Sequence, residues 1–273
     1  MRDGWEEMIG SFGDVRLYAN AVWPGDPKGT VIIIHGLCEH QGRYGHVAES
    51  LLSGGYGVCR FDLRGHGRSE GMRGFYKSFH HMAADVDAVA ERVKKDGHKG
   101  PVFLLGHSMG GMIAAIYGAM YPEKTAGIVL CGARTRFSQT KWSSCLPLPE
   151  AEDTYLETRF GENICGDRQV VEAYREDPLV EKRYTAGLRN SCWYGVQWLK
   201  EHAPSMTVPL LILHGGEDPL VSEAESREFY GYAGSRDKTL KIYPFLYHEI
   251  LNEPCKEEIL GEIKKWLDRH TDC

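Results

Sequence analysis

The chain has 273 residues, of which 42% are hydrophobic and 26% are charged. These proportions are ordinary for a globular protein, and a chain of this length can bury a large core without a disulfide or a metal ion. The formal net charge is −6 and the isoelectric point is about 6.1. This balance argues against nucleic-acid binding, which usually accompanies an excess of basic residues.

The cysteines and the N-terminal segment indicate in which cellular compartment the protein is expected. The segment MRDGWEEMIGSFGDV is acidic where a secretory signal would be apolar, and no apolar run is long enough to span a membrane. The eight cysteines form no CxxC pair. Cys59 and Cys131 lie in apolar stretches, where a reduced thiol packs as a small hydrophobic group. We expect mostly free thiols in a cytoplasmic protein, with a disulfide framework as the alternative.

Short apolar runs alternate with helical patterns along most of the chain. WEEMIGS and VRLYANAVW come first and predict a hairpin with its turn at Gly13 and Asp14. Buried strands are predicted at Thr30–Gly36, Tyr56–Gly65, Pro101–Ser108, Ala126–Ala133, Pro209–Asp218 and Thr239–Phe245. Helices are predicted at His80–Lys95, Met112–Met120, Ser222–Tyr232 and Lys256–Arg269. This alternation predicts an α/β protein with a mostly parallel, doubly wound sheet.

One stretch, from about Arg134 to Pro204, interrupts the alternation. It contains no strand-like run and many aromatic residues, and it reads as short helices at Gln169–Tyr174 and Ser191–Lys200. It is too long to be a simple loop. We therefore predict a helical cap at residues 135–205, inserted between two parts of an α/β core at residues 1–134 and 206–273.

The pentapeptide around Ser108, GHSMG, is the strongest chemical signal. It follows the apolar run VFLL and opens a stretch of small residues, GGMIAAIYG, which is the strand–turn–helix context of a nucleophile elbow. Flanking glycines allow the strand and the helix to approach closely around a strained turn. The helix N-terminus then favours negative charge that develops beside the serine. The sequence predicts Ser108 as a nucleophile of the α/β-hydrolase type.

An acid and a base follow Ser108 in the order that this fold requires. Asp218 ends a predicted strand, where functional side chains gather in open α/β sheets. His248 alone among the twelve histidines lies between the last predicted strand and the last predicted helix. A serine hydroxyl needs such a base to become a nucleophile. We predict His248 as the general base and Asp218, rather than the adjacent Glu217, as the acid that orients it.

The loop HGLCEHQGRY follows the first buried strand, where this fold places part of its oxyanion hole. The predicted donors are the backbone N–H groups of Leu37 and Met109, the residue after the nucleophile. A second glycine-rich loop, FDLRGHGRSEG, carries Asp62 and Arg64. We interpret that loop as structural, and we interpret Cys38 as a bystander beside the oxyanion loop.

Metal and cofactor motifs are not apparent. His248 and Glu249 do not belong to an H-E-x-x-H motif, because the second ligand position holds Asn252. The sequence has no phosphate-binding loop and no dinucleotide fingerprint at a helix start. We expect no metal and no cofactor.

The segments described above form a set of motifs along the chain: HGLCEHQGRY, FDLRGHGRSEG, GHSMGG, HGGEDPLV and a histidine near the C-terminus. Together, and with YREDPLV in the cap, they resemble the monoacylglycerol lipase and lysophospholipase-like branch of the α/β-hydrolases over nearly the whole chain. The resemblance implies cleavage of single-chain glycerol esters, with the acyl chain in an apolar tunnel under the cap. It places the triad and the oxyanion hole on Ser108, Asp218, His248, Leu37 and Met109. Cys38 departs from the small residue usual at its position.

The expected function is a serine carboxylester hydrolase that acts on monoacylglycerol-like or lysophospholipid-like esters through an acyl-enzyme. Two alternatives remain: a short-chain or aryl esterase or amidase with the same triad, and a non-catalytic binding module. The expected partner is a small ester with an acyl chain, and the sequence carries no signal for an oligomeric state. Trp142, Leu146 and Leu148 fit either a patch that contacts lipid surfaces or a buried part of the cap.

Overall fold

The computed structural model describes the chain except for residues 1–2, 97–99, 138–144, 159–161 and 272–273. Its strands are β1 (Asp3–Gly10), β2 (Arg16–Trp23), β3 (Thr30–Ile34), β4 (Gly57–Phe61), β5 (Val102–His107), β6 (Gly127–Cys131), β7 (Tyr155–Glu157), β8 (Arg183–Thr185), β9 (Leu210–Gly215) and β10 (Lys238–Tyr243). Its α-helices are α1 (Gly45–Ser53), α2 (Phe79–Lys95), α3 (Met109–Met120), α4 (Arg168–Glu176), α5 (Ala186–His202), α6 (Glu223–Tyr232) and α7 (Lys256–Asp268).

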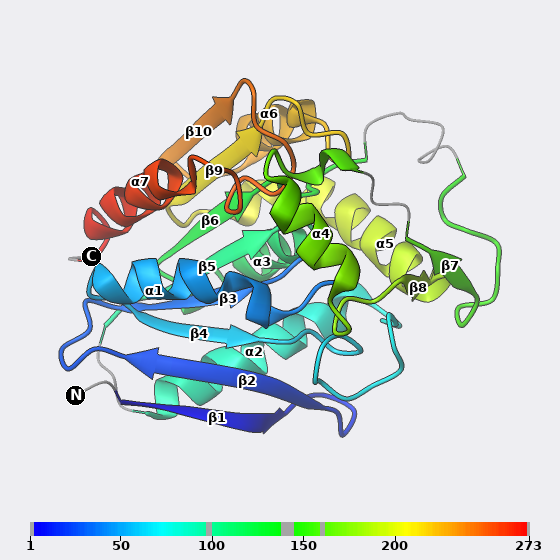
Figure 1. Cartoon of the computed structure of the whole chain (residues 1–273), viewed down its shortest axis with the longest axis horizontal. Coiled ribbons are helices and arrows are strands. Elements are labelled where there is room, and N and C mark those ends of the chain that lie inside the picture. Colours follow the sequence, from blue (N-terminus) through cyan, green and yellow to red (C-terminus); the bar gives the residue numbers. More distant parts are fainter. Residues whose placement is uncertain (1–2, 97–99, 138–144, 159–161, 272–273) are drawn as a thin grey trace.

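Eight strands form one twisted sheet in the order β1-β2-β4-β3-β5-β6-β9-β10 (Figure 1). The first two strands form the predicted hairpin, which pairs antiparallel with β4 through β2. The remaining strand pairs are parallel. The predicted mostly parallel, doubly wound sheet is therefore confirmed, and each predicted strand is present, with ends that differ by a few residues.

Side chains of the central strands alternate between two apolar layers. Ile32 and Ile34 belong to the layer that α2, α3 and α6 cover, whereas Val31 and Ile33 belong to the layer under α1 and α7. This period-two division follows from the pleat of a strand, and burial on both faces explains why β3 is apolar throughout. Figure 1 shows α1 and α7 in front of the sheet and α2 and α3 behind it.

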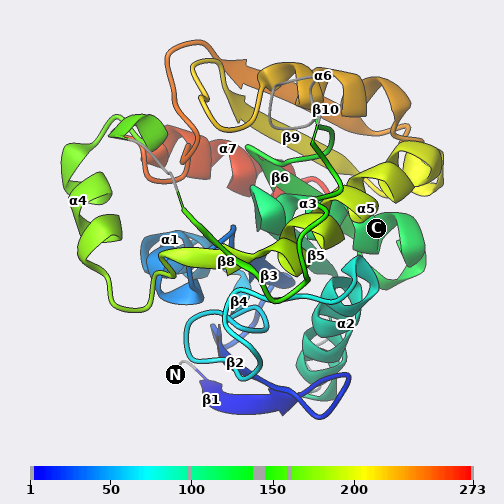
Figure 2. The same ribbon diagram turned by 90° about the vertical axis from the view of Figure 1, so that its right-hand side faces the viewer.

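The described residues between β6 and β9 include α4, β8 and α5, which lie beyond the carboxyl ends of the parallel strands (Figure 2). The prediction that this stretch contains no strand was wrong, because β7 and β8 pair antiparallel there, with Tyr155 opposite Thr185. Strands of three residues are too short to show an alternating pattern in the sequence. Helix α1 was not predicted either. The boundaries of the cap, 135 and 205, stay a prediction, and we call residues 135–205 the cap segment.

The glycine-rich loop after β4 makes structural contacts. The carboxylate of Asp62 accepts hydrogen bonds from the backbone N–H groups of Gln41 and Arg68, at 2.8 and 2.7 Å. Arg64 forms an ion pair of 2.7 Å with Asp85, whose side chain is fully buried. These contacts hold the loop against the oxyanion loop on one side and against α2 on the other.

Among the described residues, no helix is both long and apolar enough to cross a lipid bilayer.

Two buried histidines make the fold sensitive to acid. Burial lowers the pKa of His35 to about 3 and that of His66 to about 4, and the two rings lie 5.5 Å apart. A histidine whose pKa is lower in the folded state stabilises the fold above its unfolded pKa of about 6.5. That contribution is lost as the pH falls toward the folded value.

We expect the free energy of unfolding to fall between pH 7.5 and pH 5, with His66 contributing about 2 kcal/mol of the loss. The substitution His66→Asn keeps a donor for the carbonyl of Arg64 but cannot titrate, so this variant should lose correspondingly less stability over that range. Urea unfolding at both pH values measures the difference. His80→Asn, at an exposed position of α2, should behave like the wild type. Equal losses in all three proteins would contradict the prediction.

Candidate active site

Ser108 lies on the turn between β5 and α3 with backbone angles of φ 53° and ψ −115°. A positive φ is strained for a residue with a side chain, and it is the feature that a nucleophile elbow requires. The turn also needs glycine on the helix side, since a Cβ on Gly110 would lie 2.1 Å from the carbonyl oxygen of Ile34. The amide of Met109 is the first of α3, so no carbonyl within the helix accepts from it.

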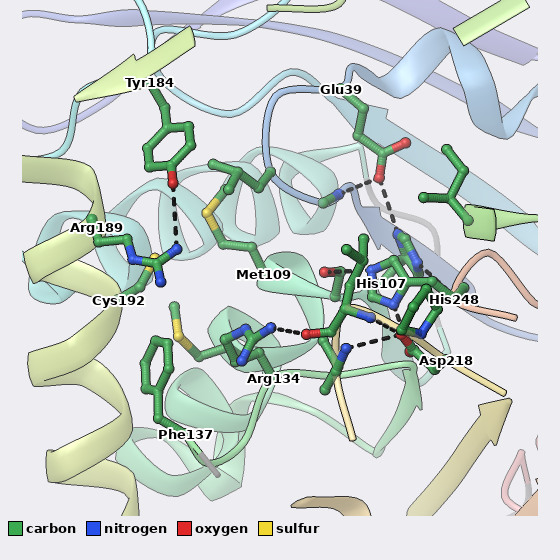
Figure 3. A pocket seen from close by; sticks show the side chains of 18 of the residues that line it. Glu39, His107, Met109, Arg134, Phe137, Tyr184, Arg189, Cys192, Asp218 and His248 are labelled. Carbon is green, nitrogen blue, oxygen red and sulfur yellow. Dashed lines mark hydrogen bonds and ion pairs between the residues drawn. The ribbon is translucent and has the colours of Figure 1, made fainter. Parts of the chain in front are cut away.

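The side chains of Ser108, His248 and Asp218 meet from three separate turns and loops, and Figure 3 shows His248 beside Asp218. His248 Nε2 lies 2.9 Å from Ser108 Oγ, and His248 Nδ1 lies 2.6 Å from Asp218 Oδ2. The other carboxylate oxygen of Asp218 accepts from the backbone N–H groups of Leu220 and Val221, at 2.8 and 2.9 Å. The three groups form a continuous relay from carboxylate to hydroxyl.

The environment of Asp218 keeps this carboxylate charged. Burial by itself raises the pKa of Asp218, but the charge of His248 and hydrogen bonds from His214 and His248 hold the pKa well below its usual value. A charged acceptor at Nδ1 requires a proton on that nitrogen, which leaves Nε2 of a neutral ring free to accept from Ser108. The neighbouring Glu217 is exposed and takes no part in the relay.

The two predicted oxyanion residues line the same cavity as Ser108. Leu37 follows β3 and Met109 opens α3, and both lie in the cavity wall next to the serine. The loop that carries Leu37 is fixed from within, because Glu39 Oε1 accepts a hydrogen bond of 2.6 Å from the backbone N–H of Gly36. The arrangement can present backbone donors to an oxygen bound at Ser108.

A buried charge network joins the oxyanion loop to the histidine loop, and the sequence analysis missed it. Arg43 Nη1 lies 2.5 Å from Glu39, and its guanidinium donates two hydrogen bonds, of 2.8 and 2.7 Å, to the carboxylate of Glu249. His107 Nδ1 lies 3.1 Å from Glu39, and its Nε2 lies 3.3 Å from the carbonyl oxygen of His248. The motif that supplies Glu39 and Arg43 was visible, but its partner is 206 residues away in the chain.

Two members of this network shift each other's pKa. Burial opposes the charge on Glu39, but Arg43 and His107 hold its pKa well below the usual value. Burial likewise lowers the pKa of His107, yet its contact with Glu39 outweighs this and raises the pKa. Each of these two side chains therefore favours the charged form of the other, and His107 lies directly behind the backbone of His248.

The cavity at this site has a volume of about 1240 Å³ and opens between the sheet and the cap segment. Most of its wall is apolar, from Leu37, Met109, Met112, Phe137, Leu148, Leu156, Ile164, Leu188 and Leu220. Two arginines, Arg134 and Arg189, also line it (Figure 3). Within the described part of the chain, no group of three or more His, Cys, Asp or Glu side chains could hold a metal ion.

Cys38 is buried beside the site with a φ of +65°. Glycine adopts this conformation without strain, which explains why a small residue is usual here. Burial raises the pKa of its thiol, so the thiolate is disfavoured. Its carbonyl oxygen accepts a hydrogen bond of 2.8 Å from the backbone N–H of Glu181 in the cap segment. Seven cysteines are free thiols: Cys38, Cys59, Cys131, Cys145, Cys165, Cys192 and Cys255.

The substitution Arg43→Met should destabilise the fold by about 3–5 kcal/mol, because it leaves the buried carboxylate of Glu249 without its cation and leaves Glu39 with His107 alone. It should also lower kcat, since Glu249 adjoins His248. Urea unfolding and ester hydrolysis measure the two effects. Arg16→Met is the matched control: it breaks an ion pair with Glu70 that is exposed, and such pairs often contribute nothing measurable. If Arg43→Met unfolds at the same urea concentration as Arg16→Met, the buried network does not stabilise the fold.

Comparisons with known proteins agree with this geometry. The family model described as serine aminopeptidase S33 matches residues 25–255. A monoacylglycerol lipase from Mycolicibacterium smegmatis is 34% identical to this chain, over 97% of each protein. The human monoglyceride lipase is 34% identical over 90% of this chain and 84% of its own length.

A solved structure extends the likeness to three dimensions. The crystal structure of the monoacylglycerol lipase from Paleococcus ferrophilus superimposes with a TM-score of 0.83 at 28% identity, over 98% of this chain and all of that one. The predicted α/β-hydrolase fold is thereby confirmed. The chain belongs to the serine aminopeptidase S33 family of α/β-hydrolases, in the branch that contains the monoacylglycerol lipases.

Proposed function

We propose that this protein is a serine carboxylester hydrolase that cleaves monoacylglycerol-like, single-chain esters through an acyl-enzyme. The observation that carries the proposal is the relay from Asp218 through His248 to Ser108, which ends inside a large, mostly apolar cavity. The relatives that match over nearly the full chain are named as lipases of this kind, which supports the choice of substrate.

In the first step, Ser108 Oγ attacks the ester carbonyl carbon while its proton passes to His248 Nε2. Asp218 stabilises the imidazolium that forms and keeps the ring oriented. The carbonyl oxygen becomes negatively charged and accepts hydrogen bonds from the N–H groups of Leu37 and Met109. When this intermediate collapses, the alcohol leaves with the proton from Nε2, and the acyl group stays on Ser108.

In the second step, water takes the place of the alcohol. His248 Nε2 removes a proton from the water as it attacks the acyl carbon, and the bond to Ser108 Oγ breaks as the proton returns to that oxygen. The products are a fatty acid and the free enzyme.

The cap segment, residues 135–205, supplies the walls that would hold the acyl chain. Leu148, Leu156 and Leu188 face the cavity opposite the sheet. A pocket with this much apolar surface favours a long hydrocarbon chain, because burying each methylene group contributes about 0.8 kcal/mol. We therefore assign the segment as a substrate-binding cap between two parts of one catalytic core.

The substitution Ser108→Ala should lower kcat for ester hydrolysis by about four to six orders of magnitude, because it removes the nucleophile. Asp218→Asn should lower kcat by about four orders of magnitude, because it favours the wrong tautomer of His248. Steady-state kinetics with a p-nitrophenyl ester measure both. A Ser108→Ala enzyme with activity near that of the wild type would refute the assignment. Covalent labelling of wild-type Ser108 by a fluorophosphonate would exclude the non-catalytic binding module.

A chain-length series separates the proposed substrate from its alternatives. We expect kcat/KM for p-nitrophenyl esters to rise beyond four acyl carbons, and monoacylglycerol to be hydrolysed. An optimum at two to four carbons without glyceride turnover would identify a short-chain or aryl esterase. Faster cleavage of the matched anilides would identify an amidase.

We further propose a cytoplasmic location and a peripheral contact of the cap segment with lipid surfaces. Seven free thiols support the first proposal, since disulfides are rare in that compartment. Of the residues on which the second rests, Trp142 lies outside the described residues, and Leu148 lines the cavity. Co-sedimentation of the wild type and of Trp142→Ser with liposomes tests this contact. If the contact exists, the variant should associate more weakly with the liposomes than the wild type does.

A further inference from the structure

We propose that His214 is a positioning residue that keeps the carboxylate of Asp218 turned toward His248. This inference rests on the proposed hydrolysis, because it extends the same relay by one residue. His214 lies in β9, one residue before the end of that strand, and its side chain is fully buried. It does not line the cavity, so it can act on the reaction only through its neighbours.

Nitrogen Nε2 of the His214 ring faces two oxygen atoms. It lies 2.9 Å from the carbonyl oxygen of Val221 and 3.2 Å from Asp218 Oδ2. A carbonyl and a charged carboxylate can only accept hydrogen bonds, so Nε2 carries the proton. Asp218 Oδ2 is also the atom that lies 2.6 Å from His248 Nδ1. The oxygen that orients the general base is therefore in contact with two imidazole N–H groups.

The other nitrogen of the ring fixes the ring's orientation. Nδ1 of His214 lies 2.7 Å from Oγ of Ser226, a fully buried residue of α6. In a neutral ring with its proton on Nε2, Nδ1 accepts a hydrogen bond from this hydroxyl. A flipped ring would place C–H groups against Ser226 and Asp218, and the polar contacts of both nitrogens would be lost. Hydroxyl, imidazole and carboxylate thus follow one another twice, with Asp218 shared between the two sets.

Loss of the His214 N–H has a predictable effect on the reaction. Burial raises the pKa of Asp218, whereas the charge of His248 and the contact with His214 lower it. A carboxylate that keeps its charge with one donor fewer attracts the imidazolium of His248 more strongly. The free enzyme then holds a proton on His248 up to a higher pH, and in that form His248 cannot accept the proton of Ser108. The carboxylate also keeps fewer contacts that fix its orientation, which lowers kcat.

Other titratable side chains around the relay stay the same when His214 is replaced. They are His107, whose ring lies 4.8 Å from that of His248, Glu249, which pairs with Arg43, and Glu225, which pairs with Arg134. A change in the pH profile of a His214 variant is therefore attributable to the contact with Asp218.

The test compares His214→Gln with His214→Asn in the hydrolysis of a p-nitrophenyl ester. A glutamine amide ends close to the position of Nε2 and can donate to Asp218, whereas an asparagine amide ends near the position of Nδ1. We expect kcat to fall about tenfold in His214→Asn, as loss of a donor to a charged group implies, and much less in His214→Gln. The acid midpoint of the kcat/KM profile should move to higher pH in His214→Asn alone. KM should stay constant, because His214 is outside the cavity.

The matched control is His270→Asn. His270 is also buried, and its Nε2 lies 2.9 Å from the carboxylate of Asp237, outside the site. This variant should lose stability in urea unfolding but keep the wild-type kcat and the wild-type acid midpoint.

A second measurement uses the wild type and does not depend on how the variants fold. In the nitrogen NMR spectrum at neutral pH, the His214 ring should carry a proton on Nε2. An unprotonated Nε2 would overturn the proposal, since Asp218 and Val221 would then face a nitrogen that cannot donate.

A kcat of His214→Asn equal to that of the wild type would also overturn the proposal. So would an acid midpoint that stays in place or moves to lower pH in His214→Asn, because a merely structural role changes stability without an upward shift. A loss in His214→Gln as large as that in His214→Asn would do the same. These outcomes leave the hydrolase function intact, because the wild type stays active. A wild type that hydrolyses no ester and is not labelled at Ser108 by a fluorophosphonate would instead overturn the proposed function itself.

Discussion

The contact between Arg43 and Glu249 is the interaction on which the site depends most. It joins the loop after β3 to the loop after β10, two segments that lie 206 residues apart in the chain. Glu39 and His107 complete the network and reach the backbone on both sides, at Gly36 and at His248. A buried guanidinium with two carboxylate partners has few alternative arrangements. Moving any one of the three groups would leave a charge in the interior without a partner. The network thus fixes the position of the loop that carries Leu37 relative to His248.

The sheet determines where the remaining loops of the site lie. Parallel strands place their carboxyl ends at one edge, so β3, β5, β9 and β10 deliver their following loops to the same region. Two apolar layers hold these strands from both faces, and the strained backbone of Ser108 persists because strand β5 and helix α3 are both fixed. The cap segment then adds apolar side chains to the wall of the cavity.

Much of this arrangement was predictable from the sequence, and the limits have physical reasons. The elbow at Ser108 is a local motif, and the order of Asp218 and His248 follows from the topology, so the convergence of the three side chains could be expected. Arg43 and Glu249 could not be paired in advance, because no local pattern connects two loops that only the folded sheet brings together. Strands β7 and β8 were missed because each is three residues long. Their pairing depends on contacts between distant parts of the cap segment rather than on an alternating pattern.

The hydrogen bond from Glu181 to the carbonyl oxygen of Cys38 has a mechanical consequence. It connects the main chain of the cap segment to the residue beside Leu37, so a rigid outward swing of the segment at this edge would pull on the oxyanion loop. Under the proposed mechanism, movements of the segment that admit a lipid or release its products are therefore coupled to the position of the Leu37 N–H group.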